Sequence, residues 1–283
     1  MRCYACSRPT PPRQRYCSRC RFYVVGRKEQ LKRRAAMREA DDPALDAYRD
    51  HWSGVPLDGR DSTGPFRMGF DHLYPVRSSR LVVCSDLSNL MKTELGPEEF
   101  RLAVAELTAH HNGAPFRRDL IKFEYWDLRA PKPGARDRSR GRLTNENVEE
   151  CVVCGDPPVR WSYYCERCRR FLVTRGYDRS HHVRALREAW DPKIRRFRCH
   201  YTGAWLDDAD PMSPWYLTYD HRVPGRAGSI VVAAAWVNAM KTALSEQEFW
   251  AVVAEYDKFL NRGGEFDRDV VEFKYWRRAR RRG

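Results

Sequence analysis

Two short motifs in this 283-residue sequence combine residue types that could carry out chemistry, and each motif occurs twice. The first is a pair of Cys-x-x-Cys motifs separated by ten residues, and the second is an Asp-His dipeptide followed by Asn-x-x-Lys. The cysteines recur after 148 residues, Asp-His and Asn-x-x-Lys after 149, and a later Tyr-Trp dipeptide after 150. Two single-residue insertions explain this drift, so the sequence contains a tandem duplication.

The paired cysteine motifs predict one zinc site in each copy. Two close pairs of thiolates can complete the tetrahedral coordination of Zn²⁺, whereas a redox role or iron–sulfur ligation has no supporting sequence context. A four-cysteine site leaves no coordination position open, so we expect a structural role. Cys84 and Cys199 have no cysteine counterpart in the other copy and are not expected to be ligands. The predicted ligands are Cys3, Cys6, Cys17 and Cys20 in copy one and Cys151, Cys154, Cys165 and Cys168 in copy two.

The residues around Asp-His predict a pair of strands. Aromatic and β-branched residues precede Asp71-His72 and Asp220-His221, as in a short strand that enters a loop. The apolar stretches RLVVCSDL and SIVVAAAWV then predict a second strand in each copy.

Helices are expected on both sides of these strands. A basic stretch, residues 27–43 in copy one and 180–192 in copy two, ends at Asp-Pro, where proline disfavours helix for the preceding residue. It could lie along phosphates or be a solvated face. After the second strand, residues 88–111 and 237–260 are predicted to be helical, with a capping box formed by Ser245 and Glu248. At the equivalent place in copy one, Pro97 lies in the first turn of the long helix.

The order Asp-His, β-hairpin, and Asn-x-x-Lys on a helix resembles the HNH endonuclease family, whose core is the ββα-metal fold. The resemblance covers roughly residues 50–100 and 199–249 and includes the entry segments SGVPLD and YTGAWLD. It implies one divalent ion per copy, Mg²⁺ or Mn²⁺, bound by hard oxygen ligands, and an imidazole that deprotonates the attacking water. The implied ion ligands are Asp71 and Asn89 in copy one and Asp220 and Asn238 in copy two, and the implied bases are His72 and His221.

The sequence also departs from the family pattern. The middle Asn of the motif falls near Arg80 in copy one and Ser229 in copy two, and the last His is Asn in both copies. An alternative is that Asp-His is a turn and that the two Asn residues are helix caps. His51 and His200 also correspond and could contact phosphate, support the site or stabilise a hairpin. The residues expected to contact nucleic acid are Lys92, Lys241, Arg80 and Arg222.

The charge of the chain favours a polyanionic partner. The net charge is +14, with 28 Lys and Arg against 21 Asp and Glu in residues 1–150, and 24 against 17 in residues 151–283. Because both halves share this bias and interleave it with aromatic residues, we expect a nucleic-acid partner, and double-stranded DNA in particular. An Arg-rich solvated surface is the alternative. No apolar run approaches the ~20 residues of a membrane span, so we expect a soluble, cytoplasmic protein encoded by a prokaryote or a phage.

These features together predict an α+β fold with two tandem copies of a zinc ribbon plus an HNH-like domain. The first copy spans 1–126, with the ribbon at about 1–26 and the HNH-like domain at about 48–126. A linker rich in Arg, Gly and Pro follows at 127–150. The second copy spans 151–276, with the ribbon at about 151–176 and the HNH-like domain at about 197–276, and a basic tail ends the chain at 277–283.

We expect a metal-dependent DNA endonuclease that is a monomer and acts as a pseudo-dimer, with one active site per copy. The alternative is a non-catalytic zinc-ribbon protein that binds nucleic acid through degenerate HNH-like domains.

Overall fold

The computed structural model describes residues 1–57, 64–76, 78–126, 148–160, 162–172 and 179–276. Most of the predicted linker (127–147) and the predicted basic tail (277–283) lie outside these residues. Copy one contains, in chain order, α1 (Ser18–Val24), α2 (Gln30–Ala40), β1 (Asp41–Asp42), β2 (Ala47–Arg49), β3 (Pro56–Leu57), β4 (Met68–His72), β5 (Leu81–Ser85), α3 (Asp86–Lys92), α4 (Pro97–His111) and the 3-10 helix η1 (Arg118–Leu120).

Copy two repeats most of this order. Its elements are α5 (Glu166–Leu172), α6 (Arg179–Ala189), β6 (Trp190–Asp191), β7 (Arg196–Phe197), β8 (Leu217–His221), the 3-10 helix η3 (Ala227–Ser229), β9 (Ile230–Ala234), α7 (Ala235–Lys241) and α8 (Glu246–Arg262). The chain is therefore a mixture of helices and small antiparallel sheets, which confirms the α+β class.

The hairpin predicted around Asp-His is present in both copies. Strands β4 and β5 pair antiparallel with Asp71 opposite Val82, and β8 and β9 pair with Asp220 opposite Val231. All five residues of β5 and all five of β9 are buried. Their apolar runs are covered because α2 packs against β5 and α6 packs against β9.

The helical stretch after each hairpin consists of two helices. Thr93 ends α3 and Thr242 ends α7, each with a positive φ, of 53° and 48° respectively. The positive φ turns the chain sharply at each threonine, in a conformation that β-branched residues rarely adopt. The predicted capping box starts α8, where the Ser245 hydroxyl accepts from the backbone N–H of Glu248.

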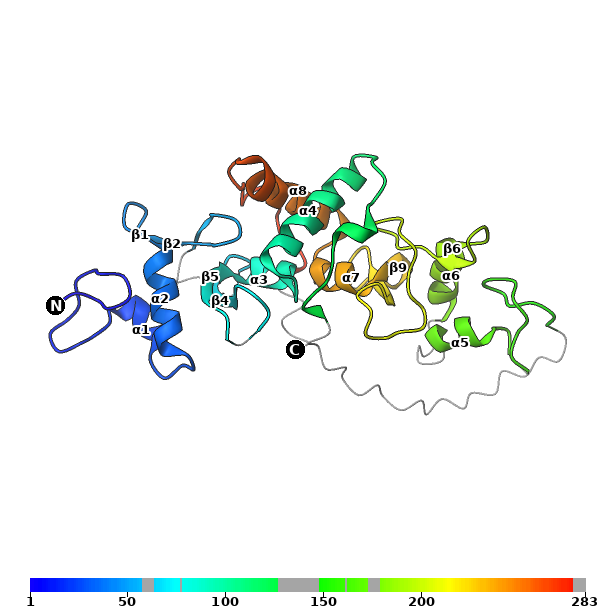
Figure 1. Cartoon of the computed structure of the whole chain (residues 1–283), viewed down its shortest axis with the longest axis horizontal. Helices are drawn as coiled ribbons and strands as arrows, with labels where there is room; N and C mark the ends of the chain where they lie inside the picture. Colours follow the sequence, from blue (N-terminus) through cyan, green and yellow to red (C-terminus); the bar gives the residue numbers. More distant parts are fainter. Residues whose placement is uncertain (58–63, 77, 127–147, 161, 173–178, 277–283) are drawn as a thin grey trace.

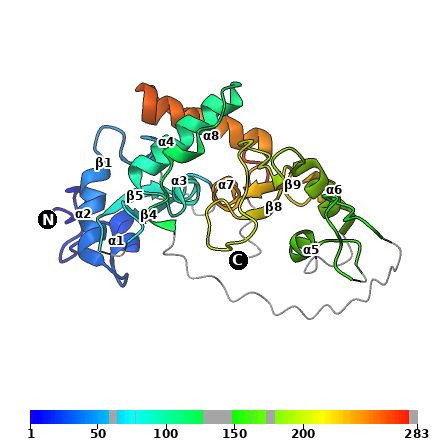
Figure 2. The ribbon, with the colours of Figure 1, turned by 45° about the vertical axis from the view of Figure 1, so that its right-hand side comes forward.

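The two copies pack against each other through equivalent helices. Helix α4 lies beside α8 and α3 lies beside α7, and both views show α4 and α8 crossing above the two hairpins (Figures 1 and 2). At this junction His111 stacks on Trp250 with a distance of 4.4 Å between ring centroids, and Phe100 contacts Tyr256 edge to face.

The aromatic segment that closes each copy packs on the other copy. Phe123 of copy one contacts Trp215 of copy two at 5.8 Å between ring centroids, and Phe273 of copy two contacts Phe66 of copy one at 5.6 Å. Since Phe66 and Trp215 are 149 residues apart and Phe123 and Phe273 are 150 apart, these contacts are equivalent. Reciprocal contacts of this kind characterise a two-fold interface, here formed within one chain.

Candidate functional site

The four cysteines of copy one come together in a cluster that could hold zinc. All four thiol sulfurs lie within 4.8 Å of one another. The Sγ–Sγ distances are 3.7 Å from Cys6 to Cys17, 3.4 Å from Cys17 to Cys20 and 3.4 Å from Cys20 to Cys6. Tetrahedral coordination with Zn–S bonds of about 2.3 Å separates two sulfurs by roughly 3.8 Å, so the cluster has a suitable size.

The cluster of copy two has the same form. The Sγ of Cys154 lies 3.5 Å from that of Cys165 and 3.6 Å from that of Cys168. Burial raises the pKa of the Cys168 thiol well above its usual range, and the negative charges of the other three sulfurs raise it further. A bound Zn²⁺ would offset both effects, because it stabilises four thiolates together. The two clusters are thus compatible with two structural zinc ions.

Secondary structure positions each zinc cluster. In copy one Cys17 is the N-cap of α1, and Cys20 lies in the first turn of that helix, fully buried. The hydroxyl of Tyr48, from β2, lies 2.9 Å from the Cys20 sulfur. Cys84 is buried in β5 and Cys199 is buried just after β7, and neither belongs to the two cysteine clusters found among the described residues.

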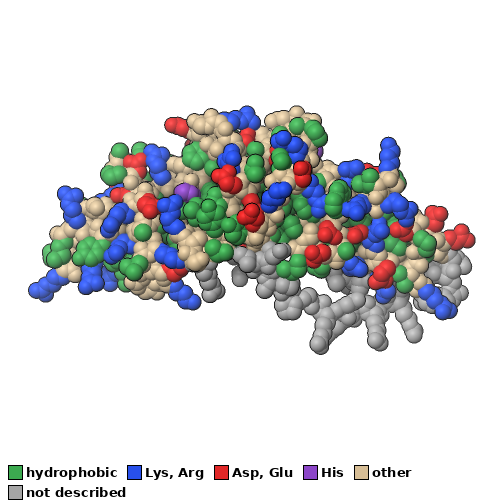
Figure 3. Space-filling view, in the orientation of Figure 1, with side chains coloured by type: hydrophobic (Ala, Val, Ile, Leu, Met, Phe, Trp, Pro, Cys, Tyr) green, Lys and Arg blue, Asp and Glu red, His purple; other side chains and the backbone are tan. Residues whose placement is uncertain are grey.

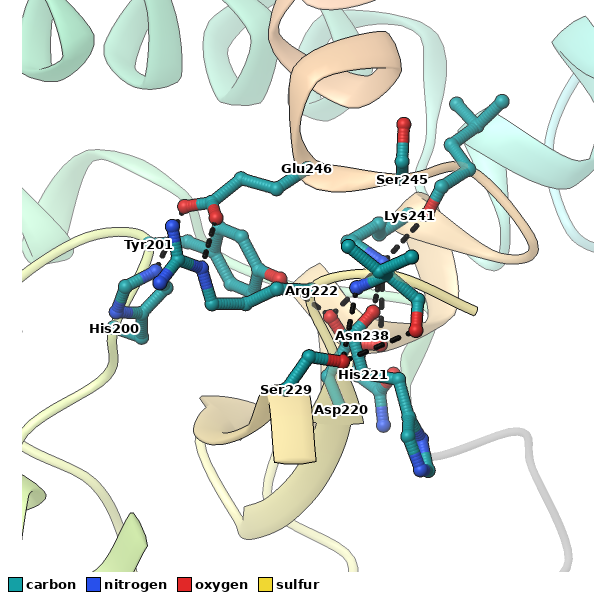
Figure 4. Close-up of polar contacts among 12 residues, drawn as sticks. His200, Tyr201, Asp220, His221, Arg222, Ser229, Asn238, Lys241, Ser245 and Glu246 are labelled. Carbon is teal, nitrogen blue, oxygen red and sulfur yellow. Dashed lines mark hydrogen bonds and ion pairs between the residues drawn. The ribbon is translucent and has the colours of Figure 1, made fainter. Parts of the chain in front are cut away.

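The second site begins at the end of β8 in copy two, where Asp220 lies against helix α7. Figure 4 shows the Asp220, Tyr201 and Lys241 side chains converging. The Tyr201 hydroxyl donates to Oδ2 of Asp220 at 2.5 Å, and Nζ of Lys241 lies 3.1 Å from the same oxygen. Asp220 is 6% exposed and Lys241 is 0% exposed, so this is a buried ion pair.

Lys241 is held by two more acceptors. Its ammonium donates to the backbone oxygens of His221 at 2.9 Å and Leu244 at 2.6 Å. Burial lowers the pKa of the Lys241 ammonium, and the Asp220 carboxylate offsets part of that effect. With its donors committed inside the protein, Lys241 does not present its charge at the surface. The expectation that it contacts a phosphate directly does not agree with this position.

In copy one the equivalent pair is Asp71 and Lys92. Nζ of Lys92 lies 3.1 Å from Oδ2 of Asp71, and Lys92 is 1% exposed. Burial raises the pKa of Asp71, although the Lys92 charge opposes the shift. Lys92 also lies 5.5 Å from the centre of the Trp52 ring, which occupies the place of Tyr201. The predicted phosphate contact of Lys92 is likewise inconsistent with its burial.

The histidines that follow the two Asp residues lie on the other side of the hairpin. Successive side chains of a strand point to opposite faces, so His72 points away from Lys92. Its Nδ1 lies 3.4 Å from the Ser79 hydroxyl, and its Nε2 lies 3.7 Å from the Glu29 carboxylate at the start of α2. In copy two His221 is exposed at the end of β8. The structure therefore brings Asp and Lys together and places His at the adjacent edge.

The two Asn residues differ in their surroundings. The Asn238 amide nitrogen donates to the Thr218 hydroxyl at 3.2 Å and to the backbone oxygen of Tyr219 at 3.1 Å, which ties α7 to β8. Asn89 of α3 is exposed. Both lie inside their helices, so neither is the N-cap that the alternative interpretation required.

Arg80 and Arg222 are exposed, and each is paired with a carboxylate. Nη1 of Arg80 lies 3.2 Å from Oε2 of Glu39. Arg222 binds the Glu246 carboxylate, whose Oε1 also accepts a hydrogen bond from Nε2 of His200 at 2.7 Å. Burial alone would raise the pKa of Glu246, but the hydrogen bonds from His200 and Arg222 outweigh it and lower the pKa to about 2.

Two features were not anticipated from the sequence. One is the hydrogen bond from Tyr201 to Asp220, and the other is the cluster in which His200 and Arg222 bind Glu246. The counterparts of Tyr201 and Glu246 are Trp52 and Pro97, so a search for residues shared by the two copies passes over them. At the position of the missing middle Asn, the Ser229 hydroxyl donates to the backbone oxygens of Val223 and Arg226 and holds the loop closed.

The oxygen ligands implied for Mg²⁺ or Mn²⁺ fit copy one better than copy two. Oδ2 of Asp71 is buried, and its partner among the described residues is the Lys92 ammonium, 3.1 Å away. In copy two Oδ2 of Asp220 accepts from Tyr201, and its Oδ1 accepts from Lys241 at 3.4 Å. A hard cation would compete with a Lys ammonium for either carboxylate, and at Asp220 it would compete with the Tyr201 hydroxyl as well.

Comparisons of the chain with protein-family models, with curated proteins and with solved structures find no match. Within the described part of the chain, no helix is both long enough and apolar enough to cross a membrane.

Proposed function

We propose that the chain is a metal-dependent endonuclease that hydrolyses phosphodiester bonds in DNA, with one HNH-like site in each copy. The observation that carries the proposal is the repeated arrangement of hairpin and helix. In each copy a strand ends in Asp-His, and the following helix brings a Lys within 3.1 Å of the Asp carboxylate. The copies have diverged in many surrounding residues, yet this arrangement of charged groups is present in both.

The charge near the histidines supports a phosphate-bearing substrate. Helix α2 packs along the hairpin of copy one, and its Lys32 donates to the backbone oxygen of Ser79, beside His72. Arg33 of the same helix lies 4.5 Å from the centre of the Phe70 ring, on the strand that carries His72. Figure 3 shows further Lys and Arg side chains over both copies on one face of the molecule. A phosphate at the end of the hairpin would therefore meet Lys32 and Arg33 close to the imidazole, where the Glu29 carboxylate offsets part of their positive charge.

The chain's own residues have distinct roles in this proposal. Asp71 and Asn89, and Asp220 and Asn238, would hold the divalent ion, which would neutralise charge on the phosphate and stabilise the leaving oxygen. His72 and His221 accept a proton from the attacking water. Lys92 and Lys241 hold the Asp carboxylates in place rather than contacting phosphate. The nucleic-acid contacts fall to exposed groups such as Arg80, Arg222 and the basic helix.

The proposal is tested by incubating the full chain with supercoiled plasmid, with Mg²⁺ or without added divalent ion. We expect nicked or linear DNA only with the ion. Replacing both His72 and His221 by Ala should lower the cleavage rate by about 10²–10⁴-fold. The matched control is His110→Ala, at the end of α4, which should cut like the parent. Cleavage by the double variant at the parental rate would show that these histidines are not the bases.

One observation favours a second candidate, a nucleic-acid-binding protein without catalysis. Both Asp carboxylates are neutralised by a buried Lys, as in a site where an ammonium has replaced a metal ion. That candidate predicts salt-dependent DNA binding and no cleavage at any Mg²⁺ concentration, so the same plasmid assay separates the two.

A further inference from the structure

The two Asp–Lys pairs have different aromatic neighbours, and the neighbour in copy two carries a hydroxyl group. In copy two Tyr201 is 1% exposed, and its hydroxyl donates to Asp220 at 2.5 Å. Its counterpart Trp52 is 3% exposed and has only an indole N–H, which has no hydrogen-bond partner among the described residues. Among the described residues, Oδ2 of Asp71 therefore contacts the Lys92 ammonium alone, whereas Oδ2 of Asp220 contacts both the Lys241 ammonium and the Tyr201 hydroxyl.

This hydroxyl opposes binding of a cation by Asp220. An ion that coordinates Oδ2 must compete with the Tyr201 hydrogen bond for the lone pairs of that oxygen. If the hydrogen bond is lost, the hydroxyl remains buried beside the rings of Phe249 and Trp250, which contact Tyr201 at 5.7 and 6.0 Å between centroids. A buried donor that loses a charged acceptor carries a substantial penalty. Asp71 requires no such exchange.

We propose that Tyr201 is a positioning residue that makes the two divalent-ion sites unequal. Copy one binds the ion first, and copy two binds it roughly 10- to 100-fold more weakly, the range expected for one hydrogen bond to a charged group. This inference rests on the proposed function, because it assigns an order of ion loading to the same two sites. At limiting ion concentration only copy one is loaded, so one DNA strand is cut. At higher concentration both sites are loaded.

The test is a Mn²⁺ titration of the zinc-loaded full chain, followed by the electron paramagnetic resonance signal of free Mn²⁺. The parent should show two classes of site, and Tyr201→Phe should bring the weaker class to within about threefold of the tighter one. Tyr256→Phe is the matched control, since it removes a buried hydroxyl that bonds Ser88 rather than an Asp, and it should leave both classes unchanged. Asp71→Asn should remove the tighter class and Asp220→Asn the weaker one.

The outcomes separate the inference from the proposed function. Two equal classes in the parent, or unequal classes that Tyr201→Phe does not change, overturn the inference and leave the endonuclease proposal intact. No Mn²⁺ binding that depends on Asp71 or Asp220 overturns both. Because Asp71→Asn leaves Lys92 buried without a counterion, circular dichroism monitors its folding. Asn89→Ala is a second variant that assigns the tighter class of site to copy one. Because Asn89 is exposed, its replacement should not disturb folding.

Discussion

The two copies place a tyrosine hydroxyl at different sites. In copy one Tyr48 lies with its hydroxyl 2.9 Å from the zinc-cluster sulfur of Cys20, while Trp52 lies beside the Asp–Lys pair. In copy two Phe197 takes the place of Tyr48, and Tyr201 bonds Asp220. The charged and ligating groups are thus the same in both copies, whereas the uncharged aromatic residues beside them differ.

This exchange indicates where the duplicated module tolerates change. A cysteine lost from a four-cysteine cluster leaves the ion incompletely coordinated, and a lost Lys leaves a buried Asp unpaired, so either loss is costly. A hydroxyl beside a sulfur or a carboxylate alters the strength of the site without removing it. The two copies therefore provide matched variants of one module inside a single chain.

The largest difference between the copies should appear when one zinc cluster is broken. Cys17→Ser should release one of two zinc ions and destabilise copy one, and Cys165→Ser should do the same for copy two. Structural zinc contributes ~10 kcal/mol or more of apparent binding free energy in zinc-finger peptides, so local unfolding is expected. Elemental analysis gives the zinc content, and limited proteolysis shows which copy opens. Two zinc ions retained in either variant would contradict the four-cysteine assignment.

The next largest effect is expected from the buried lysines. Lys92→Met and Lys241→Met each remove the partner of a buried carboxylate, which typically costs about 3–5 kcal/mol. Lys92→Met removes the buried ammonium that pairs with Asp71, whereas after Lys241→Met the carboxylate of Asp220 keeps the Tyr201 hydroxyl. Denaturant unfolding measures both losses. An unchanged midpoint in both variants would show that these ion pairs do not hold the hairpins to their helices.

These ion pairs also show what the sequence could and could not predict. The hairpins followed from the aromatic and β-branched residues before Asp-His and the apolar stretches after it, and the zinc clusters followed from cysteine spacing that was identical in the two copies. Burial of Lys92 and Lys241 could not be predicted, because lysine is almost never fully buried unless it is paired. Their partners are about twenty residues away in sequence and meet them only when the helix packs on the hairpin.

The reciprocal packing of the aromatic segments was only half predicted. The apolar and aromatic residues of FRRDLIKFEYW and FDRDVVEFKYW indicate segments that pack, and Ile121 and Trp126 are buried. A sequence pattern shows which residues are apolar but does not show which surface covers them. Here the covering surface belongs in part to the other copy, as in the contact of Phe123 with Trp215.

A smaller effect concerns the pH dependence of copy two. Hydrogen bonds from His200 and Arg222 outweigh burial and lower the pKa of Glu246 to about 2, from 4.5. A lowered folded-state pKa means that this stabilisation is present above pH 4.5 and is lost as the pH falls toward 2. The loss is on the order of 3 kcal/mol at most, since one pKa unit corresponds to about 1.4 kcal/mol.

The variant that tests this pH effect is Glu246→Gln, which removes the carboxylate bound by His200 and Arg222. Copy one has Pro97 at the equivalent position, so the effect is expected in copy two. The variant should be less stable than the parent at pH 6 and closer to it at pH 2.5. Thermal unfolding across this range measures the difference. A stability gap between parent and variant that does not narrow on acidification would show that the Glu246 contacts contribute little.

The smallest effect is expected where the copies meet. The Tyr256 hydroxyl lies 2.7 Å from the Ser88 hydroxyl across the junction, and the Ser88 hydroxyl donates to the buried Asp50 carboxylate at 2.8 Å. The equivalent positions on the opposite side of the pseudo-two-fold are Leu107 and Val237, so only one side has this hydrogen bond.

Tyr256→Phe should therefore cost about 1 kcal/mol, the usual net contribution of one hydrogen bond, because Ser88 keeps its bond to Asp50. Ser88→Ala should cost more, roughly 1–3 kcal/mol, since it removes a partner of the buried Tyr256 hydroxyl and one donor from Asp50. A double-mutant cycle measured by denaturant unfolding should give a coupling of about 1 kcal/mol between the two residues. A coupling near zero would show that the apolar contacts alone, such as Phe100 against Tyr256, hold the two copies together at this point.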